Sequence, residues 1–170
     1  MTDLDWLRSA WNQLQDDFRN GIFKPRNETD IQAHLYHLLF LNRPKNRTVV
    51  TEYDAKMNLG RKERTKHIDL AILRKSDSQL RLLIEIKETS AGSSKTDHVA
   101  EKIRKDIEKM NATLITKGAP LTRKPVQIFF FRGAGCIDPK LDDALTELRT
   151  RLWKSRKVRF FWGPRSVAEI

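Results

Sequence analysis

The sequence predicts an α/β domain in which a central mixed β-sheet is flanked by helices. Four segments carry apolar residues three or four positions apart, which is the spacing of an amphipathic helix. Shorter runs of apolar, β-branched and aromatic residues lie between them and have the length of strands. Three of these runs follow one another before helices and strands begin to alternate, so the order of elements favours a mixed sheet with a hairpin at its centre.

Length and composition set the class of the protein. The chain has 170 residues, 39% of them apolar, which suits one domain over residues 1–170. No apolar run approaches the roughly 20 residues that span a bilayer, and the first residues carry aspartates instead of an apolar signal core. The single cysteine, Cys136, fits a reducing compartment. We therefore expect a cytoplasmic protein with no membrane partner.

The formal net charge of +11 favours a polyanionic partner, with nucleic acid first among the candidates. The alternative is a basic surface that only keeps the protein soluble. The acidic residues of the central strands favour the first interpretation.

Two helices are expected at the start of the chain. The first covers residues 3–19 and is capped by Thr2 or Asp3, and the second follows the cap Asn27 and ends near Leu41. Their apolar stripes are Leu4, Leu7, Trp11, Leu14 and Phe18 in the first, and Ile31, Leu35, Leu38 and Leu39 in the second.

Glu28 lies one turn before the stripe of the second helix. A carboxylate in a first turn is stabilised by the helix dipole, and taken alone this is the favoured explanation. The other explanation is an acid directed into the same site as the acids of the central strands.

The remaining elements follow in order. A first strand is expected at 48–53, and residues 56–66, with five basic residues and one acid, are expected to form an exposed hairpin tip or a flexible loop. Beyond the central hairpin we expect a helix from Asp97 to about Met110, a strand at 126–131, a helix that begins at Asp138 and Pro139, and a last strand at 158–162.

Two apolar runs, 67–73 and 80–87, joined by a polar turn, predict the central β-hairpin. They contain three charged residues, Asp69, Glu85 and Lys87, and a charge within a buried strand is costly unless it is paired or binds a metal. Side chains alternate between the faces of a strand, so Glu85 and Lys87 point the same way, and a suitable register brings Asp69 to the same face. Two adjacent carboxylates are hard oxygen ligands that suit Mg²⁺ or Mn²⁺. The alternative is a surface hairpin with a solvated Glu85–Lys87 pair.

These residues resemble the motif of the PD-(D/E)XK nuclease superfamily, which has the restriction-endonuclease-like fold. The matching residues are Ile68-Asp69 and Glu85-Ile86-Lys87, with Glu28 similar to the helix glutamate that many members have. Ile68 stands where the motif has proline. The resemblance implies an αβββαβ core at about 27–131, with the helix at 3–19 and the helix–strand unit at 138–162 as additions.

The resemblance also implies a role for each matching residue. Asp69, Glu85 and the Ile86 backbone carbonyl would bind Mg²⁺ (or Mn²⁺), Lys87 would be the catalytic lysine and Glu28 an auxiliary acid. A single site of this kind cuts one strand, so a homodimer is one arrangement that the resemblance allows.

Several further residues are candidates for contact with nucleic acid or metal. Basic or aromatic-ring side chains near the site are expected to contact phosphates: Lys62, Arg64, Lys66, His67, Lys102 and Lys105. Glu52 on the first strand is within reach of the site, although a plain surface glutamate is the simpler interpretation. His34 and His37 have a metal-compatible spacing, but no third ligand lies nearby in the sequence, which favours surface histidines.

The function that these observations favour is a Mg²⁺-dependent endonuclease that hydrolyses phosphodiester bonds in nucleic acid, with DNA favoured over RNA. The first alternative is a non-catalytic nucleic-acid-binding or assembly protein that keeps the fold. The second alternative is a basic interaction subunit of a larger defence or repair complex.

Overall fold

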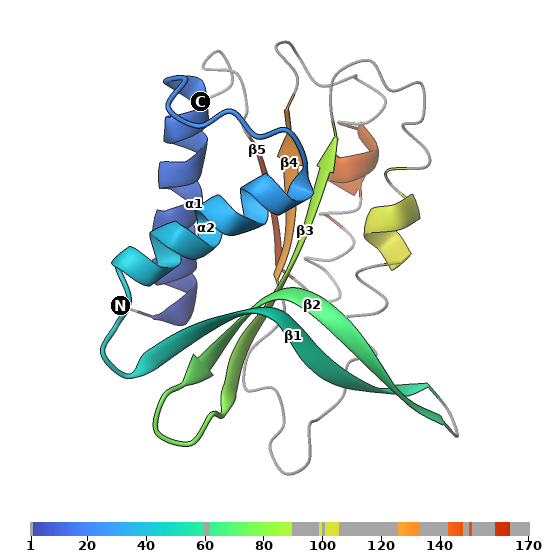
Figure 1. The fold of residues 1–170 in the computed structure, drawn as a ribbon. Helices are drawn as coiled ribbons and strands as arrows, with labels where there is room; N and C mark the ends of the chain where they lie inside the picture. Colours follow the sequence, from blue (N-terminus) through green and yellow to red (C-terminus); the bar gives the residue numbers. More distant parts are fainter. Residues whose placement is uncertain are drawn as a thin grey trace.

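A five-stranded sheet forms the centre of the structure (Figure 1). The computed structural model describes residues 2–59, 62–89, 99, 101–105, 126–132, 143–147, 150 and 159–163. Its elements are helices α1 (Asp3–Arg19) and α2 (Glu28–Leu41) and strands β1 (Arg47–Leu59), β2 (Lys62–Arg74), β3 (Leu80–Thr89), β4 (Val126–Phe131) and β5 (Arg159–Gly163). Residues 99, 101–105, 143–147 and 150 are also helical.

The sheet is mixed, as the order of elements predicted. Its strand order is β1-β2-β3-β4-β5, with antiparallel pairing from β1 to β3 and parallel pairing from β3 to β5. The helix expected at 97–110 is seen at residues 99 and 101–105, and the one expected after Asp138 at 143–147 and 150. The other residues of these two predictions, and Cys136, lie outside the described part of the chain.

The β1–β2 ribbon is longer than the sequence indicated. The register runs without a loop from Arg47 opposite Arg74 to Leu59 opposite Lys62, so residues 56–59 and 62–66 are paired strand and not a flexible loop. The hairpin alternative was therefore the correct one. Backbone pairing does not require apolar side chains, and this charged sequence hides the strand from a search based on hydrophobicity.

Helices α1 and α2 cover one face of the sheet, and the short helical segments at 101–105 and 143–147 lie on the other side (Figure 1). The predicted stripes of both helices are buried except for Phe18, which is partly buried. Trp11 and Phe18 both meet the ring of Phe130 edge-on, with centroids 5.9 and 5.1 Å away. No helix in the described part of the chain has the length and hydropathy needed to cross a membrane.

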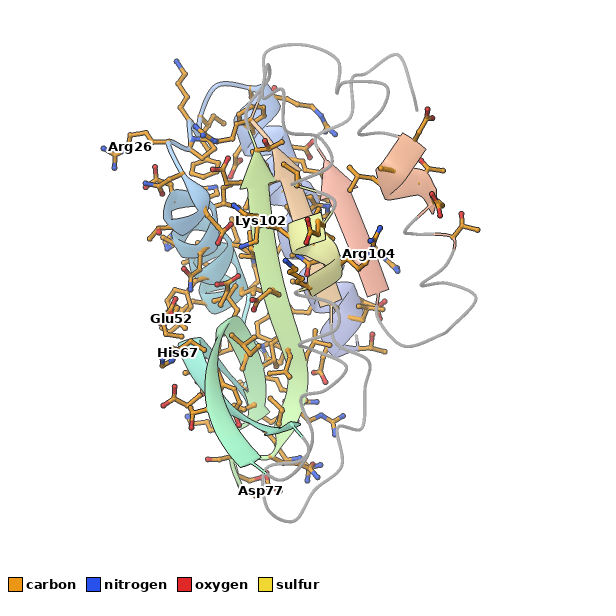
Figure 2. All side chains as sticks on the ribbon, turned by 90° about the vertical axis from the view of Figure 1, so that its right-hand side faces the viewer. Arg26, Glu52, His67, Asp77, Lys102 and Arg104 are labelled. Carbon is orange, nitrogen blue, oxygen red and sulfur yellow. The ribbon has the colours of Figure 1, made fainter. Side chains whose placement is uncertain are left out.

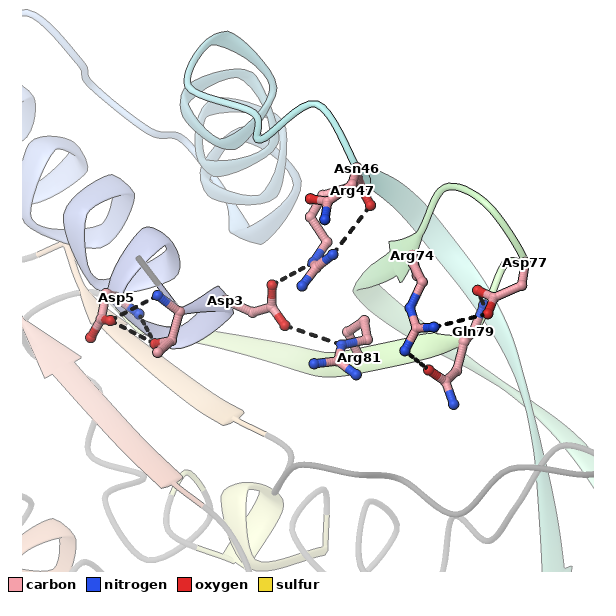
Figure 3. A network of polar contacts seen from close by, with 9 residues as sticks. Asp3, Asp5, Asn46, Arg47, Arg74, Asp77, Gln79 and Arg81 are labelled. Atoms are coloured by element: carbon pink, nitrogen blue, oxygen red, sulfur yellow. Dashed lines mark hydrogen bonds and ion pairs between the residues drawn. The ribbon is translucent and has the colours of Figure 1, made fainter.

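The start of α1 is tied to the sheet by a buried acid (Figure 3). Thr2 and Asp5 form a capping box that begins the helix. Asp3, only 3% exposed, accepts bonds from the guanidinium groups of Arg47 at the start of β1 and Arg81 on β3. One carboxylate with two arginines holds α1 in register with two strands that are distant in sequence.

We expect Phe130→Ala to lower the free energy of unfolding by about 3 to 5 kcal/mol, because it leaves a cavity beneath two aromatic rings. The measurement is urea unfolding followed by circular dichroism. The matched control is Phe40→Ala on α2, where the ring is 44% exposed and the expected loss is below about 1 kcal/mol. Equal losses at the two positions would contradict the assigned core.

Candidate functional site

The candidate site lies where β2 separates from β3. The antiparallel register of these strands ends with Leu70 opposite Ile84. One step further, Asp69 stands opposite Glu85, and its carboxylate Oδ2 accepts the backbone N–H of Ile86 at 2.6 Å. The Asp69 side chain thus accepts a hydrogen bond from a backbone N–H of β3 beyond the end of the β2–β3 ladder. This bond places the Asp69 carboxylate in the opening between the two strands.

Glu85 lies beside Asp69 and is almost fully buried, with 4% exposed. Its Oε2 accepts the backbone N–H of Asp69 at 3.4 Å, a long contact. On the other side of the strand, Gln127 of β4 donates from Nε2 to the Glu85 carbonyl at 3.3 Å and to the Ile128 carbonyl at 3.1 Å. Glu85 is therefore held from both neighbouring strands.

Lys87 and Glu28 complete the group of charges. The Lys87 ammonium donates to both carboxylate oxygens of Glu28, each at 3.2 Å. Asn27 caps α2 and thereby sets Glu28 in the first helical turn, over the second half of β3. Both explanations of Glu28 remain compatible with this position, since a first-turn acid also receives the helix dipole.

The electrostatics of the group centre on Asp69. Burial, and next the negative charge of Glu85, raise the pKa of Asp69 from 3.8 to about 7, while the Ile86 N–H and the Lys87 ammonium oppose the rise. The Glu28 carboxylate adds to it. The other three predicted charged residues thus all act on Asp69, and the net effect disfavours its ionised form.

Gln32 was missed by the sequence analysis. It lies one turn after Glu28 on α2, is 9% exposed, and donates from Nε2 to the Asp69 carbonyl at 2.7 Å and to Glu52 Oε1 at 2.9 Å. Its signal in the sequence is a polar residue next to Ile31 on the apolar side of the helix. Glu52 itself has φ of +48°, a left-handed conformation that costs a glutamate about 1 to 3 kcal/mol.

The residues expected to contact phosphates are spread along the molecule. Lys62, Arg64 and Lys66 lie on the far half of β2, in the ribbon that extends beyond the site. His67 is 70% exposed and pairs with Asp54 at 2.7 Å, so its ring is not directed at Asp69. Figure 2 shows His67 and Glu52 on the same flank of the molecule.

Lys102 and Lys105 are exposed on the helical segment 101–105, with Lys105 paired to Glu101 at 2.7 Å. Lys102 is labelled in Figure 2, where it projects over the middle of the sheet.

Of the two histidines of α2, His34 has a structural role. His34 is half-buried, bonds Asp17 of α1 at 2.8 Å and stacks on Phe23 with ring centroids 4.2 Å apart. Although burial works to raise it, the bonds from His34 and Gln13 hold the pKa of Asp17 below its usual value. The expectation of two surface histidines is wrong for His34, whereas His37 is exposed.

The donor set suits a hard cation but is small. Within residues 2–59, 62–89 and the other described segments, no group of three or more His, Cys, Asp or Glu side chains is arranged to hold a metal ion. The place where β2 separates from β3, here called the β2–β3 fork, has two neighbouring carboxylates, those of Asp69 and Glu85. The Ile86 carbonyl lies on the same edge of β3 as the N–H that Asp69 accepts, because the two polar groups of a strand residue point to the same side. Three oxygens of this kind fit Mg²⁺ or Mn²⁺ with water in the remaining positions.

Comparison with known proteins gives distant structural similarities. No family model matches the chain, and no curated protein matches it. The cAAA-bound NucC of P. aeruginosa ATCC27853 is 13% identical, with a TM-score of 0.42, and the alignment covers 86% of this chain and 71% of that one. The cAAA-bound NucC of E. coli MS115-1 is 11% identical, with the same TM-score and coverage of 86% and 70%.

We expect the metal-free protein to lose stability between pH 5 and pH 8 through Asp69. Its pKa in the folded state, about 7, lies above the ordinary 3.8, so the folded state binds the proton more tightly and loses that advantage as the pH rises. Relative to Asp69→Asn, the wild-type protein should lose about 2 to 3 kcal/mol over this interval. Urea unfolding in EDTA at pH 5 and pH 8 measures the free energy of unfolding of both proteins. An equal change with pH in wild type and Asp69→Asn would contradict a raised pKa at Asp69.

Proposed function

We propose that this protein is a metal-dependent nuclease that hydrolyses phosphodiester bonds in nucleic acid, with DNA favoured over RNA. The observation that carries the proposal is the meeting of Asp69, Glu85, Lys87 and Glu28 at the β2–β3 fork. Burying two adjacent acids is unfavourable by itself, so their presence in a strongly basic chain calls for a cation and an anionic substrate. The helix, three antiparallel strands and parallel fourth strand agree with the order of elements in the PD-(D/E)XK nuclease core.

In this proposal Asp69, Glu85 and the Ile86 carbonyl hold one Mg²⁺ or Mn²⁺. When bound, the ion supplies charge that polarises the phosphodiester and lowers the pKa of a water. The Asp69 carboxylate, which would hold the ion together with Glu85, is oriented because the Ile86 N–H donates to its Oδ2. Its raised pKa falls when positive charge is added, so the ionised form becomes the stable one.

Lys87 acts on the substrate side. It is a fixed ammonium beside the acids, and such a group stabilises negative charge that develops on the phosphoryl oxygens. Glu28 holds it in position through both carboxylate oxygens. Nucleic acid binding would draw on the β1–β2 ribbon, whose sequence carries Lys62, Arg64 and Lys66. One site cuts one strand, so cutting of both strands of a duplex requires a second copy or a second visit.

We expect Mg²⁺- or Mn²⁺-dependent cutting of DNA that EDTA abolishes. Asp69→Asn, Glu85→Gln and Lys87→Ala should each lower the cutting rate at least about a hundredfold, because each removes a charge at the reacting phosphate. The assay compares plasmid, linear duplex, single-stranded DNA and RNA on gels.

The matched control for Asp69→Asn is Asp77→Asn in the β2–β3 turn. Asp77 is paired with Arg74 and lies at the bottom of the molecule in Figure 2, away from the flank that carries Glu52, so its replacement should leave the rate unchanged. Binding of nucleic acid without cutting under any metal condition would overturn the nuclease and favour the non-catalytic binding protein.

We expect the basic ribbon to account for part of the salt dependence of DNA binding. Each phosphate contact contributes about −0.9 to the slope of log K against log salt, so the triple variant Lys62→Ala, Arg64→Ala, Lys66→Ala should reduce the slope by about 3. The control removes three charges on the α1 side, Arg8, Arg19 and Lys24. Fluorescence anisotropy between 50 and 300 mM salt measures the slope for both triple variants. An equal reduction of the slope in the two variants would indicate that DNA is attracted by net charge alone and not by the ribbon.

A further inference from the structure

The β1–β2 pairing is interrupted opposite Asp69. The register passes from Thr51 opposite Leu70 to Tyr53 opposite Ile68, and Glu52 and Asp69 between them are not a ladder pair. At this point Glu52 has the left-handed φ of +48°. A non-glycine residue in that conformation persists only where its surroundings hold it, and such residues cluster at functional sites.

The group that holds this point is the Gln32 side chain. Its amide nitrogen has two protons, and both are used, one on Glu52 Oε1 at 2.9 Å and one on the Asp69 carbonyl at 2.7 Å. Both partners are acceptors only, so the chemistry itself requires the amide nitrogen, and not the oxygen, to face them. Gln32 is buried on α2, a rigid element whose apolar stripe is packed on the sheet.

Asp69 is therefore fixed through its main chain as well as its carboxylate. Its carbonyl is bonded to Gln32, its N–H to Glu85, and its Oδ2 accepts from Ile86 N–H. Three contacts determine the direction of one side chain at the place where β2 departs from β3. Of these, only the Gln32 contact comes from outside the sheet.

We propose that Gln32 is a positioning residue that aims the Asp69 carboxylate into the fork, and that Glu52 is its anchor on β1. The inference deepens the proposed function and rests on it for its meaning in catalysis. Glu52 is exposed, as the sequence favoured, and it also accepts a hydrogen bond from Gln32. Removal of the Gln32 amide frees the Asp69 peptide and weakens the Asp69–Ile86 bond.

The test uses hydrogen exchange of the Ile86 amide in the metal-free protein, measured by NMR and divided by the rate at Ile84 to remove global unfolding. Gln32→Met keeps the volume but removes both donated bonds, and it should raise the Ile86 ratio at least about tenfold, as expected for a lost hydrogen bond to a buried group. Glu52→Gln keeps an acceptor oxygen and should stay within about twofold of wild type.

Two controls separate positioning from general stability. Gln13→Met removes a comparable amide–carboxylate bond on α1, to Asp17 at 2.7 Å, and should leave the Ile86 ratio unchanged. The double variant Gln32→Glu, Glu52→Gln restores a bond between α2 and β1 but leaves the Asp69 carbonyl without its donor, so it should behave like Gln32→Met. An unchanged ratio in Gln32→Met, or a wild-type ratio in the double variant, would overturn the inference.

Steady-state cutting provides a second readout. Gln32→Met should lower kcat about tenfold or more while KM for DNA changes little, because Gln32 is buried and its amide donates to protein acceptors. If the wild-type protein cuts no nucleic acid, the proposed function is refuted but the positioning role of Gln32 is not. The exchange measurement would still decide whether Gln32 orients Asp69.

Discussion

The hydrogen bond from the Ile86 N–H to the Asp69 carboxylate is the interaction on which the arrangement of the site depends. It lies one step beyond the last β2–β3 pair, at the place where two antiparallel strands part. A strand N–H without a ladder partner must find an acceptor, and an acid supplies it here. The same bond fixes the direction of the acid, so a requirement of the sheet also sets the geometry of the site.

The polar contacts around this place come in part from α2. The helix packs its apolar stripe on the sheet and, from successive turns, brings Glu28 to Lys87 and Gln32 to the Asp69 carbonyl. With the bond from Gln32 to Glu52, this one helix makes polar contacts with three strands. Its cap, Asn27, determines where the first turn begins and hence the position of Glu28.

Much of this could be predicted from the sequence, because local patterns carry it. The stripes of both N-terminal helices, the central hairpin and its three charged residues follow from periodicity and alternation. The ribbon at 56–66 was harder to predict, since strands stabilised by backbone pairing have no apolar signature. Gln32 escaped because its meaning depends on Asp69, 37 positions away in the chain, and a lone buried glutamine has no pattern of its own. His34 was misjudged for the same reason, since its partner Asp17 lies on another helix.

The sequence alone determined which residues carry charge within apolar strands, and hence that Asp69, Glu85 and Lys87 required an explanation. Only the tertiary structure decided how they meet. The register places Asp69 opposite Glu85, the parting of the strands lets its carboxylate reach Ile86, and the packing of α2 adds Glu28 and Gln32. The physical reason is that alternation along a strand is a local property, whereas the end of a ladder and the approach of a helix depend on contacts between distant segments.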